Sequence, residues 1–214
     1  MPGLPGWYNP GGHSSSSEKD NTMSSMAVPR YTPEQYLDME RRAQTKSEYY
    51  HGEIFAMAGA SWNHTVLVSN IDSLCNMQMQ GRPCQAVTND LRVQVGAAYY
   101  YPDVAALCGE PEFTDGHFDT LLNPMAIAEV LSPSTEAYDR GLKFVEYRRA
   151  ASLQEYVLVA QDAMRIEVYV RQDDTHWLLQ ELNQSLDVLK LESIGCAIAL
   201  ADIYRNVRLA EAPD

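Results

Sequence analysis

The chain has 214 residues, 45% hydrophobic and 9% aromatic, which is enough for one domain with a substantial core. No apolar run approaches the roughly 20 residues that cross a bilayer, and no basic stretch leads into an apolar N-terminal core, so we expect a cytoplasmic protein without a membrane segment. The formal net charge of -13 argues against a nucleic-acid partner, because affinity for the phosphate backbone comes from clustered lysine and arginine.

The first 30 residues form a Ser-, Gly- and Pro-rich tail that includes the run Ser14 to Ser17. Such a composition predicts disorder, and we expect a single folded domain over residues 31–214. Thr32 is a good N-cap and Pro33 suits the first helical position, so the first helix is expected over residues 33–43.

The remaining chain alternates between strand and helix patterns. A strand or hairpin with Gly52 at its turn precedes an amphipathic helix that ends at Gly81. Further strands are expected at 85–95, 99–108, 125–132, 153–162, 164–172 and 176–182, a helix at 133–149, and a final strand with a short helix at 191–204. This order predicts a mixed central sheet flanked by helices, in an α/β or α+β domain.

The four cysteines form no CxxC pair and have no histidine at ligand spacing, which argues against a structural zinc site. They are Cys75, Cys84, Cys108 and Cys196. We expect reduced cysteines that pack in the core.

Two acidic residues and one lysine stand where a metal-dependent nuclease would need them. Asp103 follows Pro102, directly after a run of three tyrosines, and Glu129 interrupts the apolar run MAIAEVL. Neighbouring strands bring opposite side chains within about 5 Å, so both carboxylates could bind one Mg²⁺ or Mn²⁺. Lys143 lies on the next helix, on one face with Asp139 and Tyr147, and could stabilise charge on a phosphoryl group. The alternative is structural: Asp103 caps a turn and Glu129 pairs with a core cation, without a metal.

Other polar residues are weaker candidates for the same site. Glu53 and Asp90 are possible further metal or network ligands, and His64 could reach the cleft from the start of the second helix. For each of these the structural alternative is an ordinary paired side chain. The segment from Asp139 to Arg149 is locally cationic, and its arginines are candidates for contacts with a nucleic-acid backbone: Arg140, Arg148 and Arg149.

Several segments in order resemble the Uma family, a family of restriction-endonuclease-like proteins within the PD-(D/E)XK nuclease superfamily. The resemblance runs from Tyr31 to Tyr204 and is carried by YTPEQYLDME, SEYYHGEIFAMAGAS, NDLRV, YYYPDV, EVLSPSTEAYDRGLKFVEYRR and LQEYVLV. It implies a restriction-endonuclease-like core, with Asp103 as the motif aspartate and Glu129 as the second acid. The superfamily lysine two places after the glutamate is replaced by Leu131, and the resemblance implies that Lys143 takes its role.

Three functions follow as hypotheses. The first is a Mg²⁺- or Mn²⁺-dependent endonuclease that hydrolyses DNA phosphodiester bonds. The alternative is a catalytically inactive nuclease fold that binds nucleic acid or protein, which the net charge of -13 favours. A third is hydrolysis of a different phosphate ester. A homodimer is expected only by analogy with nucleases of this fold.

Overall fold

The computed structural model describes residues 30–57 and 59–209, so the expected disordered tail over residues 1–30 lies outside the described residues except for Arg30. The helices are α1 (Pro33–Glu40), α2 (Trp62–Met79), α3 (Glu136–Tyr138), α4 (Phe144–Tyr147) and α5 (Leu200–Ile203), with a π-helical turn η1 (Asp139–Lys143) and a 3₁₀ turn η2 (Glu192–Ile194). The strands are β1 (Ser47–Tyr50), β2 (Glu53–Ala56), β3 (Cys84–Thr88), β4 (Arg92–Val95), β5 (Ala98–Tyr100), β6 (Val104–Cys108), β7 (Thr120–Leu121), β8 (Ala126–Leu131), β9 (Glu155–Ala160), β10 (Ile166–Arg171), β11 (Trp177–Leu182), β12 (Val188–Leu191) and β13 (Cys196–Ala199).

The strands of the central sheet follow the order β11-β10-β9-β8-β6-β3. Strands β8 and β9 are parallel and the other neighbours are antiparallel, so the sheet is mixed, as predicted. A parallel pair needs a long crossover, and here the segment α3–η1–α4 supplies it. A five-stranded sheet in the order β2-β1-β5-β4-β7 and the pair β12-β13 complete the fold.

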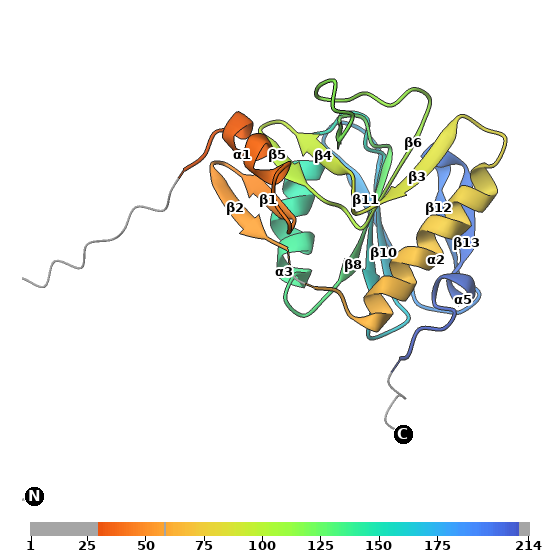
Figure 1. The fold of residues 1–214 in the computed structure, drawn as a ribbon. Coiled ribbons are helices and arrows are strands. Elements are labelled where there is room, and N and C mark those ends of the chain that lie inside the picture. The colour runs from red at the N-terminus through yellow and green to blue at the C-terminus, as the bar shows by residue number, and fades with distance from the viewer. Residues whose placement is uncertain (1–29, 58, 210–214) are drawn as a thin grey trace, which may run out of the picture.

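Each face of the central sheet carries its own core (Figure 1). Helix α2 and the pair β12-β13 cover one face, whereas the five-stranded sheet and the α3–η1–α4 segment cover the other. Strand β8 shows how the sequence makes this division. Ala128 and Val130 pack in the α2 core, and Ile127 and Leu131 pack in the opposite core. Because side chains alternate along a strand, Glu129 faces the same way as Ile127 and Leu131.

Helix α1 begins as its sequence predicts and ends sooner. The Thr32 side chain accepts a hydrogen bond from Gln35 N, the Gln35 side chain accepts one from Thr32 N, and Pro33 opens the helix. The helix ends at Glu40 rather than at residue 43. The Glu40 carboxylate turns back to accept hydrogen bonds from Ser47, which ties this end of the helix to β1.

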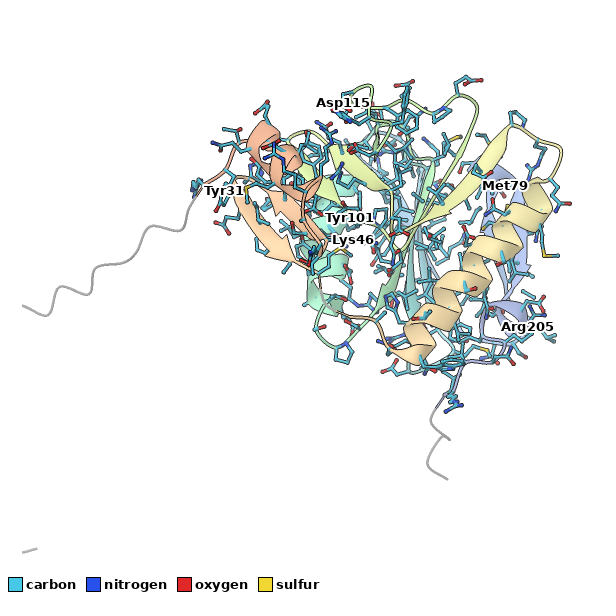
Figure 2. The ribbon with its side chains drawn as sticks, viewed as in Figure 1. Tyr31, Lys46, Met79, Tyr101, Asp115 and Arg205 are labelled. Atoms are coloured by element: carbon cyan, nitrogen blue, oxygen red, sulfur yellow. A yellow bond between two sulfur atoms is a disulfide. The ribbon has the colours of Figure 1, made fainter. Side chains whose placement is uncertain are left out.

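The expected strand over residues 85–95 is wrong as a single element. It divides into β3 and β4, which belong to different sheets and are joined by a turn at Asn89 and Asp90. The side chain of Asp90 is therefore 82% exposed and pairs with Lys46, which lies beside Tyr101 in Figure 2. Polar turn formers interrupt the alternation here, and the chain changes sheets at that point.

The expectation of four reduced cysteines is wrong for two of them. Cys84 and Cys108 form a disulfide, because the antiparallel register of β3 and β6 places them directly opposite each other with Cα atoms 3.9 Å apart. Cys75 and Cys196 are free and buried in the α2 core. Within the described ranges, no helix combines the length and apolarity that a membrane crossing requires.

An ion-pair cluster ties α1 to the loop before β7. Arg41 donates hydrogen bonds to Asp119 and Asp115 (Asp115 is labelled in Figure 2), and the buried Arg92 also pairs with Asp119. The hydrogen bond from Arg41 is the main reason that the pKa of Asp119 lies well below its ordinary value. A carboxylate with a lowered pKa stabilises the fold above the unfolded-state pKa of about 3.9 and loses that contribution as the pH falls.

We therefore expect Asp119→Asn to lower the free energy of unfolding at pH 7 by about 1–2 kcal/mol. The difference from the parent should shrink as the pH is lowered from 5 toward 2, because the unfolded parent protonates this carboxylate at a higher pH than the folded parent does. Urea unfolding at pH 7 and at pH 3 measures both effects. A difference that stays the same at the two pH values would contradict this assignment.

Candidate functional site

Asp103 and Glu129 come together because β6 and β8 pair in a fixed register. Val104 lies opposite Ala128, so continuing the antiparallel register by one residue places Asp103 opposite Glu129. The Asp103 backbone N–H donates to Glu129 Oε2 at 3.4 Å, and the Val130 N–H donates to Asp103 Oδ2 at 2.8 Å. The two side chains are almost fully buried, with residue exposures of 8% and 3%. Each carboxylate is thus held by the backbone of the other strand.

Lys143 reaches these carboxylates from the π-helical turn η1. Its Nζ lies 3.1 Å from Glu129 Oε1, 3.0 Å from Glu48 Oε1 and 3.5 Å from Asp139 Oδ1. The helix expected over residues 133–149 is broken into α3, η1 and α4, and the wider turn is a feature often found at functional sites. Tyr147, on α4, donates its hydroxyl to Glu129 Oε1 at 3.2 Å.

Glu48 is the member of this cluster that the sequence reasoning missed. It lies on β1, is 5% exposed, and accepts a hydrogen bond from the backbone N–H of Tyr101 at 3.1 Å. The sequence pattern at Glu48 is the same as that at Glu129, a single acidic residue within a strand of large nonionic residues. At Glu48 these residues are the tyrosines of SEYY. Glu53, which the sequence indicates as a further acid, lies nearer the hairpin turn and is not among the residues that line the cavity beside Asp103.

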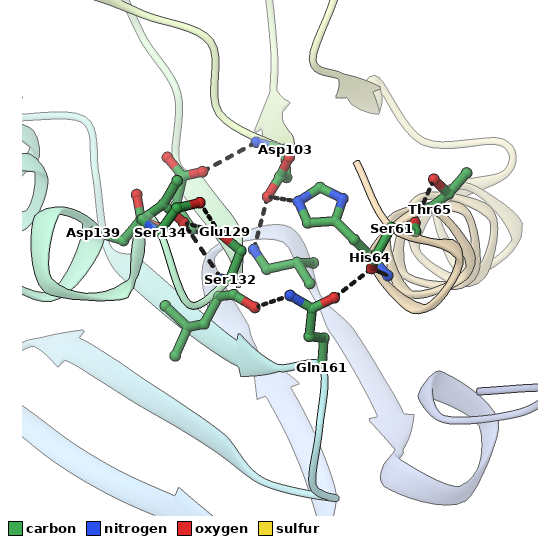
Figure 3. Close-up of polar contacts among 12 residues, drawn as sticks. Ser61, His64, Thr65, Asp103, Glu129, Ser132, Ser134, Asp139 and Gln161 are labelled. Atoms are coloured by element: carbon green, nitrogen blue, oxygen red, sulfur yellow. Dashed lines mark hydrogen bonds and ion pairs between the residues drawn. The ribbon is translucent and has the colours of Figure 1, made fainter. Parts of the chain in front are cut away.

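His64 joins the site from the first turn of α2, as the sequence allowed. Its Nε2 lies 3.1 Å from Asp103 Oδ2. The Ser61 hydroxyl caps the helix by accepting from His64 N, and it also donates to the Gln161 side chain, which donates to Leu131 O at 2.9 Å (Figure 3). The end of α2 that carries His64 is therefore fastened to the ends of β8 and β9.

The buried cluster holds more negative charge than positive charge. The carboxylates of Glu48, Glu129 and Asp139 are buried within 3.5 Å of the ammonium group of Lys143, and that of Asp103 is buried beside Glu129. Burial is the main cause that raises the pKa of Glu129 well above its ordinary value, and the neighbouring carboxylates raise it further. Burial also raises the pKa of Asp139. The excess of negative charge suits a site that receives a cation.

The ammonium group of Lys143 keeps its proton in this setting. Burial alone would favour its neutral form, but the carboxylates of Glu129, Glu48 and Asp139 raise its pKa well above the ordinary lysine value. Lys143 therefore places a positive charge beside Glu129.

These groups lie at the floor of a cavity of about 520 Å³. Its lining includes the four acids, Lys143 and His64. Its wall includes hydroxyl groups from the turn between β8 and α3: Ser132, Ser134 and Thr135. The cavity therefore leads from the surface to the paired carboxylates.

The predicted backbone-binding arginines lie elsewhere. Arg140 is paired with Glu136 at 2.8 Å and also with Glu167. Arg148 and Arg149 line a separate depression together with Arg171 and Trp177, and Arg149 is paired with Glu146 at 2.8 Å. None of the three lines the carboxylate cavity of the described structure.

The donor chemistry of Asp103 and Glu129 fits a hard divalent cation. Among the residues that the structure describes, no group of three or more His, Cys, Asp or Glu side chains forms a full metal-binding set. Mg²⁺, however, is usually bound through one or two carboxylates and keeps several waters. Two adjacent, buried carboxylates with excess negative charge around them meet that requirement.

Comparison with known proteins places the chain in a family. The model of the Uma2 family, described as "Putative restriction endonuclease", matches residues 33–201. The chain belongs to the Uma2 family. Two relatives from Synechocystis sp. are described as uncharacterized proteins. The protein slr1290 is 39% identical, and the match covers 86% of this chain and 96% of the relative. The protein sll1609 is 40% identical, and the match covers 71% of this chain and 86% of the relative.

A solved structure shares the fold of this Uma2 chain. It is described as a putative nuclease belonging to DUF820 from Anabaena variabilis, with a TM-score of 0.70 and 18% sequence identity. The match covers 82% of this chain and 98% of that one. The resemblance and the mixed-sheet fold predicted from sequence are thus confirmed, and the catalytic roles of individual residues stay predictions.

Proposed function

We propose that this Uma2 chain is a metal-dependent nuclease that hydrolyses DNA phosphodiester bonds. The observation that carries the proposal is the convergence of Asp103, Glu129 and Lys143, from a strand start, a strand and a π-turn, at the floor of one cavity. Two carboxylates with an ammonium group are the groups that such hydrolysis requires. Membership of the family supports the same function.

The position of each residue indicates the role that it would have in this reaction. Asp103 and Glu129 would hold Mg²⁺ or Mn²⁺, which when bound supplies positive charge at the phosphate and an activated water. Lys143 places its fixed ammonium group beside Glu129, where it would stabilise negative charge that develops on the phosphoryl oxygens. His64 holds the Asp103 carboxylate, and Tyr147 holds that of Glu129.

The net charge of -13 favours a second candidate, a nuclease fold that binds a partner without cutting DNA. A measurement of metal binding distinguishes the nuclease from the binding protein. We expect calorimetric titration of the parent with Mn²⁺ to show saturable binding, and Asp103→Asn to weaken it by about ten- to a hundredfold through the loss of one charged ligand. Equal binding by the two proteins, or none by either, would count against the nuclease and for the binding protein.

A further inference from the structure

Phe55 stands beside the buried acids with its ring open to solvent. In the antiparallel hairpin of β1 and β2, Phe55 lies directly opposite Glu48. Opposite residues in such a pair project from the same face, so Phe55 points toward the side on which Glu48 meets Lys143. Phe55 lines the cavity, yet it is 41% exposed. An exposed aromatic ring at the edge of a catalytic cavity is available to a ligand.

The rest of the cavity wall is aromatic, apolar and hydroxylic rather than cationic. Tyr101, Tyr138, Met57 and Pro133 contribute to it. The Tyr138 hydroxyl is buried and has no hydrogen-bond partner among the described residues. No arginine is among the described residues that line the cavity, and the only lysine among them is Lys143, which is already paired with three carboxylates. A wall of this kind suits the face of a base better than the two phosphate backbones of a duplex.

The burial of the proposed catalytic residues supports the same substrate. The groups expected to act on the phosphate are nearly inaccessible at the surface, since Asp103, Glu129 and Lys143 are 8%, 3% and 6% exposed. A nucleotide that is already unpaired can enter such a cavity without the cost of leaving a base pair and the base stack.

We propose that the cavity accepts one unpaired nucleotide, with its base stacked on Phe55 and its phosphate at the divalent cation that Asp103 and Glu129 would hold. The substrate class is then single-stranded DNA, or an unpaired stretch within a duplex, in preference to continuous duplex. This inference rests on the proposed nuclease function, and it adds the structural state of the DNA that is bound and cut.

The test uses the full chain and one DNA sequence in three forms: single strand, perfect duplex, and duplex with a central unpaired bulge. Binding of each fluorescently labelled DNA is measured by anisotropy with Ca²⁺, apart from cleavage, and cleavage is measured with Mn²⁺. The variants are Phe55→Ala, Phe55→Tyr, which keeps a ring, and Phe118→Ala. Phe118 is a matched control, because it is another exposed phenylalanine, 68% accessible, that does not line the cavity.

We expect the parent to bind and cut the single strand and the bulge at least about ten times better than the duplex. Phe55→Ala should weaken single-strand binding by roughly 5- to 150-fold, since base stacking on an aromatic side chain is worth about 1–3 kcal/mol. Phe55→Tyr and Phe118→Ala should stay near the parent value.

Each contrary result has a distinct meaning. Duplex binding equal to single-strand binding, or an effect of Phe55→Ala no larger than that of Phe118→Ala, would overturn the inference and leave the nuclease assignment standing. Single-strand binding that depends on Phe55, with no cleavage of any DNA, would refute the nuclease and retain the unpaired-nucleotide site. No binding of any of the three DNAs would overturn the inference as well.

Discussion

Replacement of Glu129 by glutamine is expected to reduce DNA cleavage by about three orders of magnitude, the scale seen when a group that stabilises transition-state charge is removed. Glutamine keeps the size of the side chain and one carbonyl oxygen, but it removes the charge that would hold the cation. The fold should persist, because the substitution lowers the excess of negative charge among Glu48, Asp103 and Asp139. Initial cleavage rates and thermal unfolding of the purified variant measure both effects.

Glu155 supplies the matched control for this variant. It is as deeply buried as Glu129, with 2% exposure against 3%, and it begins the neighbouring strand β9. Its carboxylate accepts hydrogen bonds from the Ser193 backbone and hydroxyl, outside the cavity. Glu155→Gln should therefore retain cleavage. If Glu129→Gln cut DNA as fast as Glu155→Gln, Glu129 would have no catalytic role.

The largest effect on stability is expected from Lys143→Met. This substitution keeps a long apolar side chain and removes the one ammonium group that faces Glu129, Glu48 and Asp139. Removing one partner of a buried ion pair typically costs about 3–5 kcal/mol, because the remaining charge is left uncompensated. We expect the free energy of unfolding at pH 7, measured by urea denaturation, to fall by that amount.

A double substitution separates charge from packing. When Glu48→Gln is added to Lys143→Met, one of the uncompensated carboxylates disappears, and part of the lost stability should return. The change in the free energy of unfolding that Glu48→Gln causes should differ between the parent and the Lys143→Met variant. That difference measures the coupling between the two residues. A loss of less than about 1 kcal/mol in Lys143→Met, or fully additive effects, would show that the charge of Lys143 does not hold this cluster together.

The acids of the candidate site could be found from sequence where a charge interrupts an apolar run. Glu129 within MAIAEVL and Asp103 ahead of VAAL are such cases, and strand pairing then brings them together. The same pattern was present at Glu48, but a short strand among tyrosines, followed by a hairpin turn, has little periodicity to show which side chains are buried. Burial of Glu48 depends on β5 and Lys143, which are distant in the sequence.

Other features depend on tertiary contacts that local patterns do not contain. Asp90 was expected within a strand, but the chain changes sheets there and the side chain faces solvent. The π-turn that presents Lys143 lies in a segment with an ordinary helical pattern. The disulfide required the register of β3 and β6, which joins Cys84 to Cys108 across 24 positions. The cationic appearance of residues 139–149 disappears in part because Glu136, Glu167 and Glu146 pair with Arg140 and Arg149.

The central claim is that the carboxylates at the floor of this cavity form a metal-dependent nuclease site. Its most direct test is cleavage of single-stranded DNA and of supercoiled plasmid by the full chain after treatment with EDTA, before and after Mg²⁺ or Mn²⁺ is restored. We predict no cleavage in EDTA, recovery of cleavage with the metal, and no recovery in Glu129→Gln. Undiminished cleavage in EDTA, or no cleavage of either DNA with either metal, would contradict the claim.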